Sequence, residues 1–217
     1  CLSAPRIVQP GPGIRGRVYE RSDLGNALRL VDTYQHSFLY CPAVHGTGWL
    51  VYDGRRWTAD DTGEILRCAD ERATALQREA LDLPHDQRAA ALKFALTSQN
   101  FSRLEAAANI AKRYLPVRLV DLDANPHLLN VQNGTIDLRE GELQPHNPLD
   151  RCTKLAPVRF DANATHPQWD SFLAHVTGDD EALAAFLAQL AGISASGLTI
   201  EHLLLLIGPA ATGKSTF

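Results

Sequence analysis

The strongest constraint on this chain lies at its C-terminal end, where residues 201–217 read EHLLLLIGPAATGKSTF. Leu203–Ile207 is a short unbroken apolar run, which is typical of a parallel strand buried on both faces. The run leads directly into Gly208–Ser215, which matches the phosphate-loop pattern G-x-x-x-x-G-K-[ST]. Because the pattern follows an apolar strand, the sequence predicts a nucleoside-triphosphate site here rather than an ordinary glycine-containing turn between a strand and a helix.

Each residue type in this loop has a physical role in binding a triphosphate. Glycines allow the tight turn that brings backbone N–H donors close to phosphate oxygens. Lys214 supplies a positive charge to the β- and γ-phosphates, and the Ser215 hydroxyl is a ligand for Mg²⁺. A helix that begins near Gly213 directs its positive end at the nucleotide. We therefore predict Lys214 as the catalytic residue and Ser215 as the Mg²⁺ ligand. The predicted nucleotide-binding residues are Gly208, Pro209, Ala210, Ala211, Thr212, Gly213, Lys214, Ser215 and Thr216.

Length and composition limit the number of domains and the broad class of protein that this chain can be. The chain has 217 residues, begins at Cys1, contains no Met and stops two residues after Ser215, so we expect a fragment of a longer protein. With 45% hydrophobic and 21% charged residues, its composition is that of an ordinary soluble globular protein of one or two domains. No apolar run approaches the roughly 18 residues of a membrane span, so we expect no membrane partner.

The cysteines are scattered and form no C-x-x-C pair; they are Cys1, Cys41, Cys68 and Cys152. This spacing argues against a zinc site and against a disulfide framework, and it fits a reducing, cytoplasmic compartment. The uneven spacing of His36, Cys41 and His45 disfavours a metal site there.

Charge is unevenly distributed along the chain. The net charge is −4, yet residues 66–120 carry nine Lys/Arg against six Asp/Glu and are the only net-positive segment. A solvated surface is the favoured interpretation of this excess, and contact with nucleic acid is the alternative. Arg15, Arg17 and Arg21 are also more consistent with a solvated linker than with phosphate contacts.

Periodicity and turn signals divide the chain into successive regions. Residues 1–21 are rich in Pro, Gly and Arg and are predicted to be a linker. A helix is predicted after the cap residue Ser22, a hairpin over residues 48–57, and three helices over 64–115 with a break at Leu83-Pro84. A turn-rich β element follows over residues 117–160, closed by Val158-Arg159-Phe160, and two helices end at Gly178 and Gly192.

Two sets of side chains in these regions invite a functional interpretation. Trp49 and Trp57 flank the hairpin turn, where they either stack on bases or, as we favour, pack across the strands as core. The second set is a possible metal or acid/base group of Asp121, Asp123, Asp137 and His146. Its members occupy turn-forming positions, which favours a structural role.

A further set of motifs occurs in a fixed order. The set comprises Asn133-Gly134-Thr135-Ile136-Asp137-Leu138, Gly141-Glu142-Leu143, Pro145-His146, Pro167-x-Trp169 and a strand into G-x-x-x-x-G-K-S-T-F. The earlier segments Ser22–Ala27 (SDLGNA) and Gly48–Trp57 (GWLVYDGRRW) precede it. This series resembles the phage and plasmid primase–helicase family, whose pre-helicase domain is shared with poxvirus-type proteins. The resemblance covers about residues 22–217 and is more specific than the phosphate loop alone.

The resemblance implies a replicative initiation protein encoded by a phage, plasmid or mobile element and acting in a bacterial host. It implies a primase domain upstream in the same polypeptide, joined through residues 1–21, then a pre-helicase accessory domain over 22–200. Residues 201–217 would begin a superfamily 3 helicase motor, a hexameric ring that hydrolyses ATP with Mg²⁺, draws single-stranded DNA through its channel and thereby unwinds duplex DNA. The expected fold class is therefore α+β, with a helical and hairpin-bearing domain leading into the first strand of an α/β, AAA+-like motor.

Residue by residue, the resemblance extends only to the ATP loop. It covers Gly208, Thr212, Gly213, Lys214, Ser215 and Thr216. The family often has Asn where Thr212 stands, which leaves that position without a specific assigned role. The remaining motor residues are expected after Phe217, and the primase active site is expected before Cys1.

Two alternatives to a helicase motor remain open from the sequence. Residues 22–200 alone are also consistent with a non-catalytic module for oligomerisation or for docking on DNA. A phosphate-loop kinase or other NTPase is less favoured, because such enzymes commonly begin near their loop.

Overall fold

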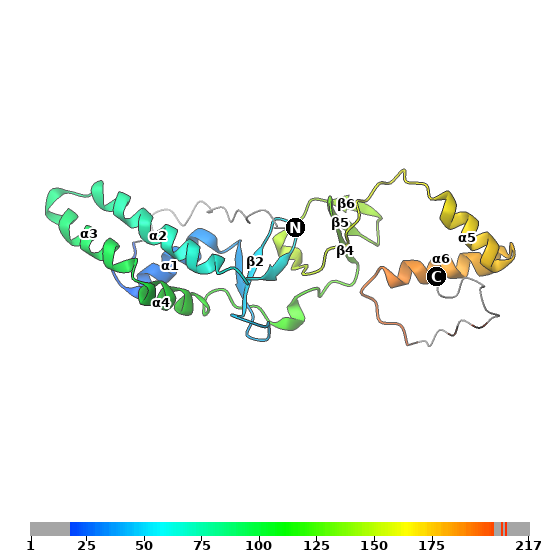
Figure 1. The fold of residues 1–217 in the computed structure, drawn as a ribbon, viewed down its shortest axis with the longest axis horizontal. Coiled ribbons are helices and arrows are strands. Elements are labelled where there is room, and N and C mark those ends of the chain that lie inside the picture. Colours follow the sequence, from blue (N-terminus) through cyan, green and yellow to red (C-terminus); the bar gives the residue numbers. More distant parts are fainter. Residues whose placement is uncertain (1–17, 202–204, 206, 208–217) are drawn as a thin grey trace. The chain divides into compact units, whose positions relative to one another are not determined.

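A computed structural model describes residues 18–201, 205 and 207 of the chain. The described residues form two compact units (Figure 1). We call residues 18–124 and 147–154 the N-terminal unit, and residues 125–146 and 155–201 the C-terminal unit. Both mix helices with a small antiparallel sheet, which confirms the α+β prediction. The predicted domain boundaries at residues 21/22 and 200/201 stay predictions.

The N-terminal unit combines four helices with a three-stranded sheet of order β1-β2-β3. Its elements are α1 (Asp23–Tyr34), β1 (Phe38–Tyr40), β2 (Trp49–Tyr52), β3 (Trp57–Ala59), α2 (Glu64–Leu81), α3 (His85–Ser98), α4 (Phe101–Ala111), and the short 3₁₀ helices η1 (Leu119–Asp121) and η2 (Pro148–Asp150). The predicted hairpin is β2–β3, in which Leu50 pairs with Ala59 and Tyr52 with Trp57. In its loop, the Asp53 carboxylate accepts the backbone N–H groups of Arg55 and Arg56.

The first helix begins where the sequence predicts it. Ser22 is its N-cap, and its hydroxyl accepts the N–H of Gly25 at 3.1 Å. Gly25 is required by close packing, because a Cβ at this position would lie 1.9 Å from the Glu20 carbonyl oxygen. The Asp23 carboxylate pairs with Arg103 on α4 at 2.9 Å, and Asn26 donates to the Ser98 hydroxyl on α3. The SDLGNA motif therefore joins α1 to two other helices.

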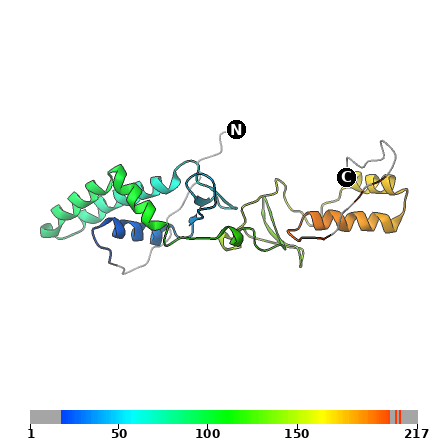
Figure 2. The same cartoon turned by 90° about the horizontal axis from the view of Figure 1, so that it is seen from below.

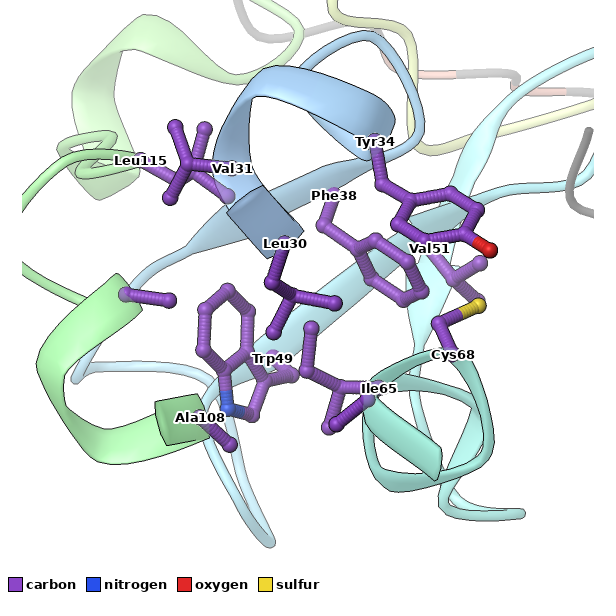
Figure 3. Packing of buried hydrophobic residues seen from close by; sticks show 12 residues of the cluster. Leu30, Val31, Tyr34, Phe38, Trp49, Val51, Ile65, Cys68, Ala108 and Leu115 are labelled. Carbon is purple, nitrogen blue, oxygen red and sulfur yellow. The ribbon is translucent and has the colours of Figure 1, made fainter. Parts of the chain in front are cut away.

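The core of the N-terminal unit lies where α1, α2 and α4 meet the sheet (Figure 3). The buried cluster consists of Leu30, Val31, Tyr34, Phe38, Trp49, Val51, Ile65, Cys68, Ala69, Ala108, Ala111 and Leu115. Phe38 is fully buried and meets the rings of Tyr34 and Trp49 edge to face, at centroid distances of 6.3 and 6.2 Å. Small alanine side chains on α2 and α4 allow these helices to approach the large rings closely.

Two details of the N-terminal unit differ from the sequence prediction. Strand β1 was not predicted, and the helix predicted to reach Leu115 ends at Ala111. The earlier end of the helix has a cause in the tertiary structure. The carbonyl of Leu115 accepts the N–H of Tyr40, and Val117 donates to the Tyr40 carbonyl. Pairing with β1 therefore competes with continuation of the helix and straightens the chain before Pro116.

The N-terminus of α2 is capped by a buried carboxylate. Asp60 is buried, and its two oxygens accept the N–H groups of Glu64 and Ile65 at 2.8 and 3.0 Å. We expect Asp60→Ala to lower the free energy of unfolding by about 2 kcal/mol, because one buried and one partly buried backbone donor lose their acceptor. Urea unfolding of the chain measures this loss. Asp70→Ala, on the exposed side of the same helix, is the control and should change stability by less than about 0.5 kcal/mol; equal losses in both variants would contradict the capping role.

The C-terminal unit contains a β-meander and a helical hairpin. Its elements are β4 (Leu128–Val131), β5 (Gly134–Asp137), β6 (Glu142–Gln144), α5 (Pro167–Thr177) and α6 (Glu181–Ser194). The Asn-Gly and Glu-Gly turns lie between paired strands as predicted. Pro167 begins α5, Gly178 ends it in the left-handed conformation, and the Asp180 carboxylate caps α6. Residues 158–160 form no strand; instead Val158 and Phe160 bond to Gln132 and Asn133 beside the β4–β5 turn.

Among the helices in the described residues, none combines the length and apolar character needed to cross a bilayer.

Candidate functional site

The predicted ATP loop, Gly208 to Thr216, lies outside the described residues. Its assigned roles, including Lys214 as catalytic residue and Ser215 as Mg²⁺ ligand, therefore stay predictions. Of the predicted strand Leu203–Ile207, only Leu205 and Ile207 are described, and neither is in a strand.

The carboxylates Asp121 and Asp123 hold a surface loop of the N-terminal unit. Hydrogen bonds from the Arg118 guanidinium lower the pKa of Asp121, and a guanidinium nitrogen of Arg151 lies 3.7 Å from Asp121 Oδ2. Asp123 accepts the backbone N–H of Thr153 at 2.7 Å and also the Thr153 hydroxyl. Both side chains are thus engaged in fixing the loop, as the structural interpretation predicts.

Asp137 and His146 belong to the C-terminal unit, whereas Asp121 and Asp123 belong to the N-terminal unit. Hydrogen bonds from Arg139 lower the pKa of Asp137 to about 2. His146 Nδ1 lies 3.0 Å from Asn130 Oδ1, which also accepts the Thr135 hydroxyl inside the meander. These contacts stabilise the sheet and its turns. Within the described residues, no group of three or more His, Cys, Asp and Glu side chains is arranged to hold a metal ion.

Both tryptophans of the hairpin are core residues, as favoured from the sequence. Trp49 and Trp57 are each 3% exposed. Trp49 packs against Phe38 and Tyr40, while Trp57 packs against Tyr52 and donates its indole N–H to the Pro148 carbonyl at 2.9 Å. Neither ring offers a face on which a base can stack.

The described cysteines are buried, unpaired thiols: Cys41, Cys68 and Cys152. Burial raises the pKa of Cys68 to about 12 and that of Cys152 to about 11. Because the thiolate is the reactive form, these two groups are unsuited to nucleophilic chemistry.

A surface that combines positive charge with aromatic rings lies after the end of α4. The Lys112 ammonium is 5.0 Å from the centroid of the Tyr40 ring, and Arg113 and the half-exposed Tyr114 follow it. We call Tyr40, Lys112, Arg113 and Tyr114 the basic–aromatic surface. Backbone pairing of Tyr40 with Leu115 and Val117 holds its two chain segments together. Sequence reasoning found the charge excess of residues 66–120 but not this surface, since Tyr40 is distant in sequence.

Several other arginines of the N-terminal unit are occupied by internal partners. Arg103 pairs with Asp23, Arg72 pairs with Glu79, and Arg29 donates to the carbonyls of Tyr19 and Glu20. By contrast, no carboxylate in the described residues forms an ion pair with Lys112 or Arg113 in the structure. These two cations are therefore available for phosphate groups.

A comparison with protein families finds a match. A family described as "D5 N terminal like" matches residues 27–178, which is 152 of the 217 residues. The match begins within α1 and ends at Gly178, immediately after α5. A search of the curated proteins finds no match.

Proposed function

The chain belongs to the D5 N terminal like family, the N-terminal part of D5-like primase–helicase proteins, and we propose that it is part of an ATP-dependent replicative DNA helicase. The proposed parent is a primase–helicase of phage, plasmid or mobile-element type. The observation that carries the proposal is the order of parts along one chain. A family module ends at Gly178, and a complete phosphate-loop pattern begins 30 residues later at Gly208.

In this proposal the phosphate loop binds ATP–Mg²⁺ and the intact protein works as a hexameric ring. Phosphoryl transfer requires mainly positioning and charge stabilisation, which the backbone N–H groups, Lys214 and Ser215 would supply. The described residues then act as the accessory module between primase and motor. The test is ATP-dependent strand separation by the intact protein. Unwinding that needs both ATP and Mg²⁺ supports the proposal, whereas an intact protein that neither hydrolyses ATP nor separates strands contradicts it.

A second candidate function, docking on DNA without chemistry, is favoured by the basic–aromatic surface. Lys112 and Arg113 supply charge for phosphates, and Tyr114 supplies a ring on which a base can stack. This function is compatible with the first, because a helicase needs a path for single-stranded DNA. A light-scattering measurement separates docking from assembly: a monomer that retards single-stranded DNA supports docking, and an oligomer formed by this chain alone supports assembly.

The docking function predicts a specific dependence on salt. Removing two phosphate contacts with the double variant Lys112→Ala, Arg113→Ala should reduce the slope of log K against log[salt] by about 1.4 for single-stranded DNA. A fluorescence anisotropy titration at several salt concentrations measures the slope. The control, Arg78→Ala with Lys93→Ala, removes two exposed charges elsewhere on the same unit. Equal changes in both double variants would show that the surface has no special role.

A further inference from the structure

The N-terminal unit carries an open groove beside the first strand of its sheet. The groove has a volume of about 430 Å³. One wall comes from residues 41–43, which follow β1, and the other comes from residues 116–119 and Asp121 around η1. Beyond α4 the chain runs alongside the sheet to η1, which brings the two walls together (Figure 2). We call this feature the β1–η1 groove.

Most of the lining of the β1–η1 groove is apolar, and part of it is exposed. Pro42 and Ala43 are exposed on one wall, and Leu119 is 57% exposed on the other. Two charged residues, Arg118 and Asp121, also line the groove. Arg118 bonds to Asp121 through Nε and Nη2, so its Nη1 group remains able to donate. The groove therefore combines apolar walls with hydrogen-bond donors and acceptors.

This combination matches the chemistry of a nucleobase. A base has two flat faces, which apolar or aromatic side chains cover when the base leaves its stack. It also has an edge of donors and acceptors, to which arginine commonly donates and from which aspartate accepts. The groove volume is within the range of pockets that hold small organic groups. A purely apolar partner would make no use of Arg118 and Asp121.

The β1–η1 groove is continuous with the basic–aromatic surface. Tyr40 of that surface forms a parallel β-bridge with Pro116 of the groove. Tyr114 is two residues before Pro116, and consecutive Cα atoms are about 3.8 Å apart. A strand whose phosphates lie on Lys112 and Arg113 therefore has a base within reach of the groove. Positive charge beside an apolar groove favours a polyanion that carries apolar bases.

We propose that the β1–η1 groove binds a base of single-stranded DNA whose phosphates lie on Lys112 and Arg113. This inference rests on the docking function proposed above and adds a preference for single strands. In a duplex the base faces are covered by stacking, so a base enters the groove only from an unpaired strand. Tyr114 then stacks on a neighbouring base of the same strand.

A comparison of two labelled strands of equal length tests this binding without any change to the protein. One is ordinary single-stranded DNA, and the other is an abasic strand with the same sugar–phosphate backbone. Fluorescence anisotropy of each strand with the chain measures both affinities. We expect the abasic strand to bind about 10-fold more weakly, because it lacks the bases that are covered on binding. Its salt dependence should be the same, because the phosphate contacts remain.

A variant of the groove wall then assigns this difference to the groove. Leu119→Asn replaces an apolar side chain by a polar one of similar size, and Leu119 is exposed, so the fold is retained. We expect this variant to bind the ordinary strand about 5-fold more weakly and the abasic strand as before. The control is Leu149→Asn in η2, an exposed leucine of the same unit that does not line the groove. It should leave both affinities unchanged.

The possible outcomes separate this inference from the docking function. Equal affinity for the two strands, with normal salt dependence, overturns the groove proposal and leaves docking intact. Binding of neither strand contradicts docking and this inference together. A preference for the ordinary strand that persists unchanged in Leu119→Asn would place the base on Tyr114 alone and overturn the groove assignment. A change of oligomeric state in Leu119→Asn, measured by light scattering with DNA affinity unchanged, would show that a second copy occupies the groove.

Discussion

Lys214→Ala in the intact protein should abolish ATP turnover and DNA unwinding while leaving the fold unchanged. The lysine is the only positive side chain in the predicted loop, and its charge is needed most when negative charge builds up on the transferred phosphoryl group. Removing a single preorganised donor of this kind costs a factor of about 100 to 1,000 in rate. Steady-state ATP hydrolysis with and without single-stranded DNA measures the loss.

The matched control for this variant is Thr212→Asn. It introduces the residue that the phage and plasmid primase–helicase family often has at this position. Both side chains donate and accept hydrogen bonds, so ATP turnover should be retained. Circular dichroism and thermal unfolding of both variants check that the fold is unchanged. Strand separation that persists in Lys214→Ala would refute the assignment of the loop.

Trp49→Ala should lower the free energy of unfolding of the chain by about 3–5 kcal/mol, the range for removing a large buried aromatic side chain. Trp49 lies in the central strand β2 and packs against Phe38 and Tyr40, so the change leaves a cavity at the centre of the N-terminal unit. Urea unfolding followed by far-ultraviolet circular dichroism measures the loss.

Tyr114→Ala is the control for this prediction, because Tyr114 is an exposed aromatic residue on the same unit. Its stability should change by less than about 0.5 kcal/mol. If Trp49→Ala instead left stability unchanged and weakened binding of single-stranded DNA, Trp49 would be a base-stacking residue after all.

Local signals in the sequence were sufficient for most helices. Ser22, Pro84, Pro167 and Gly178 each mark a helix end through hydrogen bonding or backbone geometry that operates within a few residues. The Asp-Gly and Asn-Gly pairs mark hairpins for the same reason. These elements are predictable because the residues that determine them are neighbours in the chain.

Elements that depend on distant residues were not predictable in the same way. Strand β1 has three residues and no turn signal of its own, and it exists because Trp49–Val51 pairs beside it. The side chain of Asp60 caps a helix that begins four residues later, which no short pattern indicated. Residues 147–154 return to the N-terminal unit after the β-meander, where the Cys152 carbonyl accepts the N–H of Trp57.

The same distinction applies to the candidate sites. The phosphate loop is a contiguous pattern, so the sequence predicts its residues individually. The basic–aromatic surface joins Tyr40 to Lys112 through the tertiary fold, and only the structure brings them together. The SDLGNA motif was recognised from the sequence, but its contacts with Ser98 and Arg103 required the packing of α1 against α3 and α4.

Equilibrium binding of labelled ATP to the full-length parent protein, with and without magnesium, is the most direct test of the account. We expect saturable binding that requires magnesium and is lost in Lys214→Ala. A parent protein that binds no ATP under these conditions would contradict the assignment of Gly208–Ser215 as a nucleotide site, and with it the proposed motor.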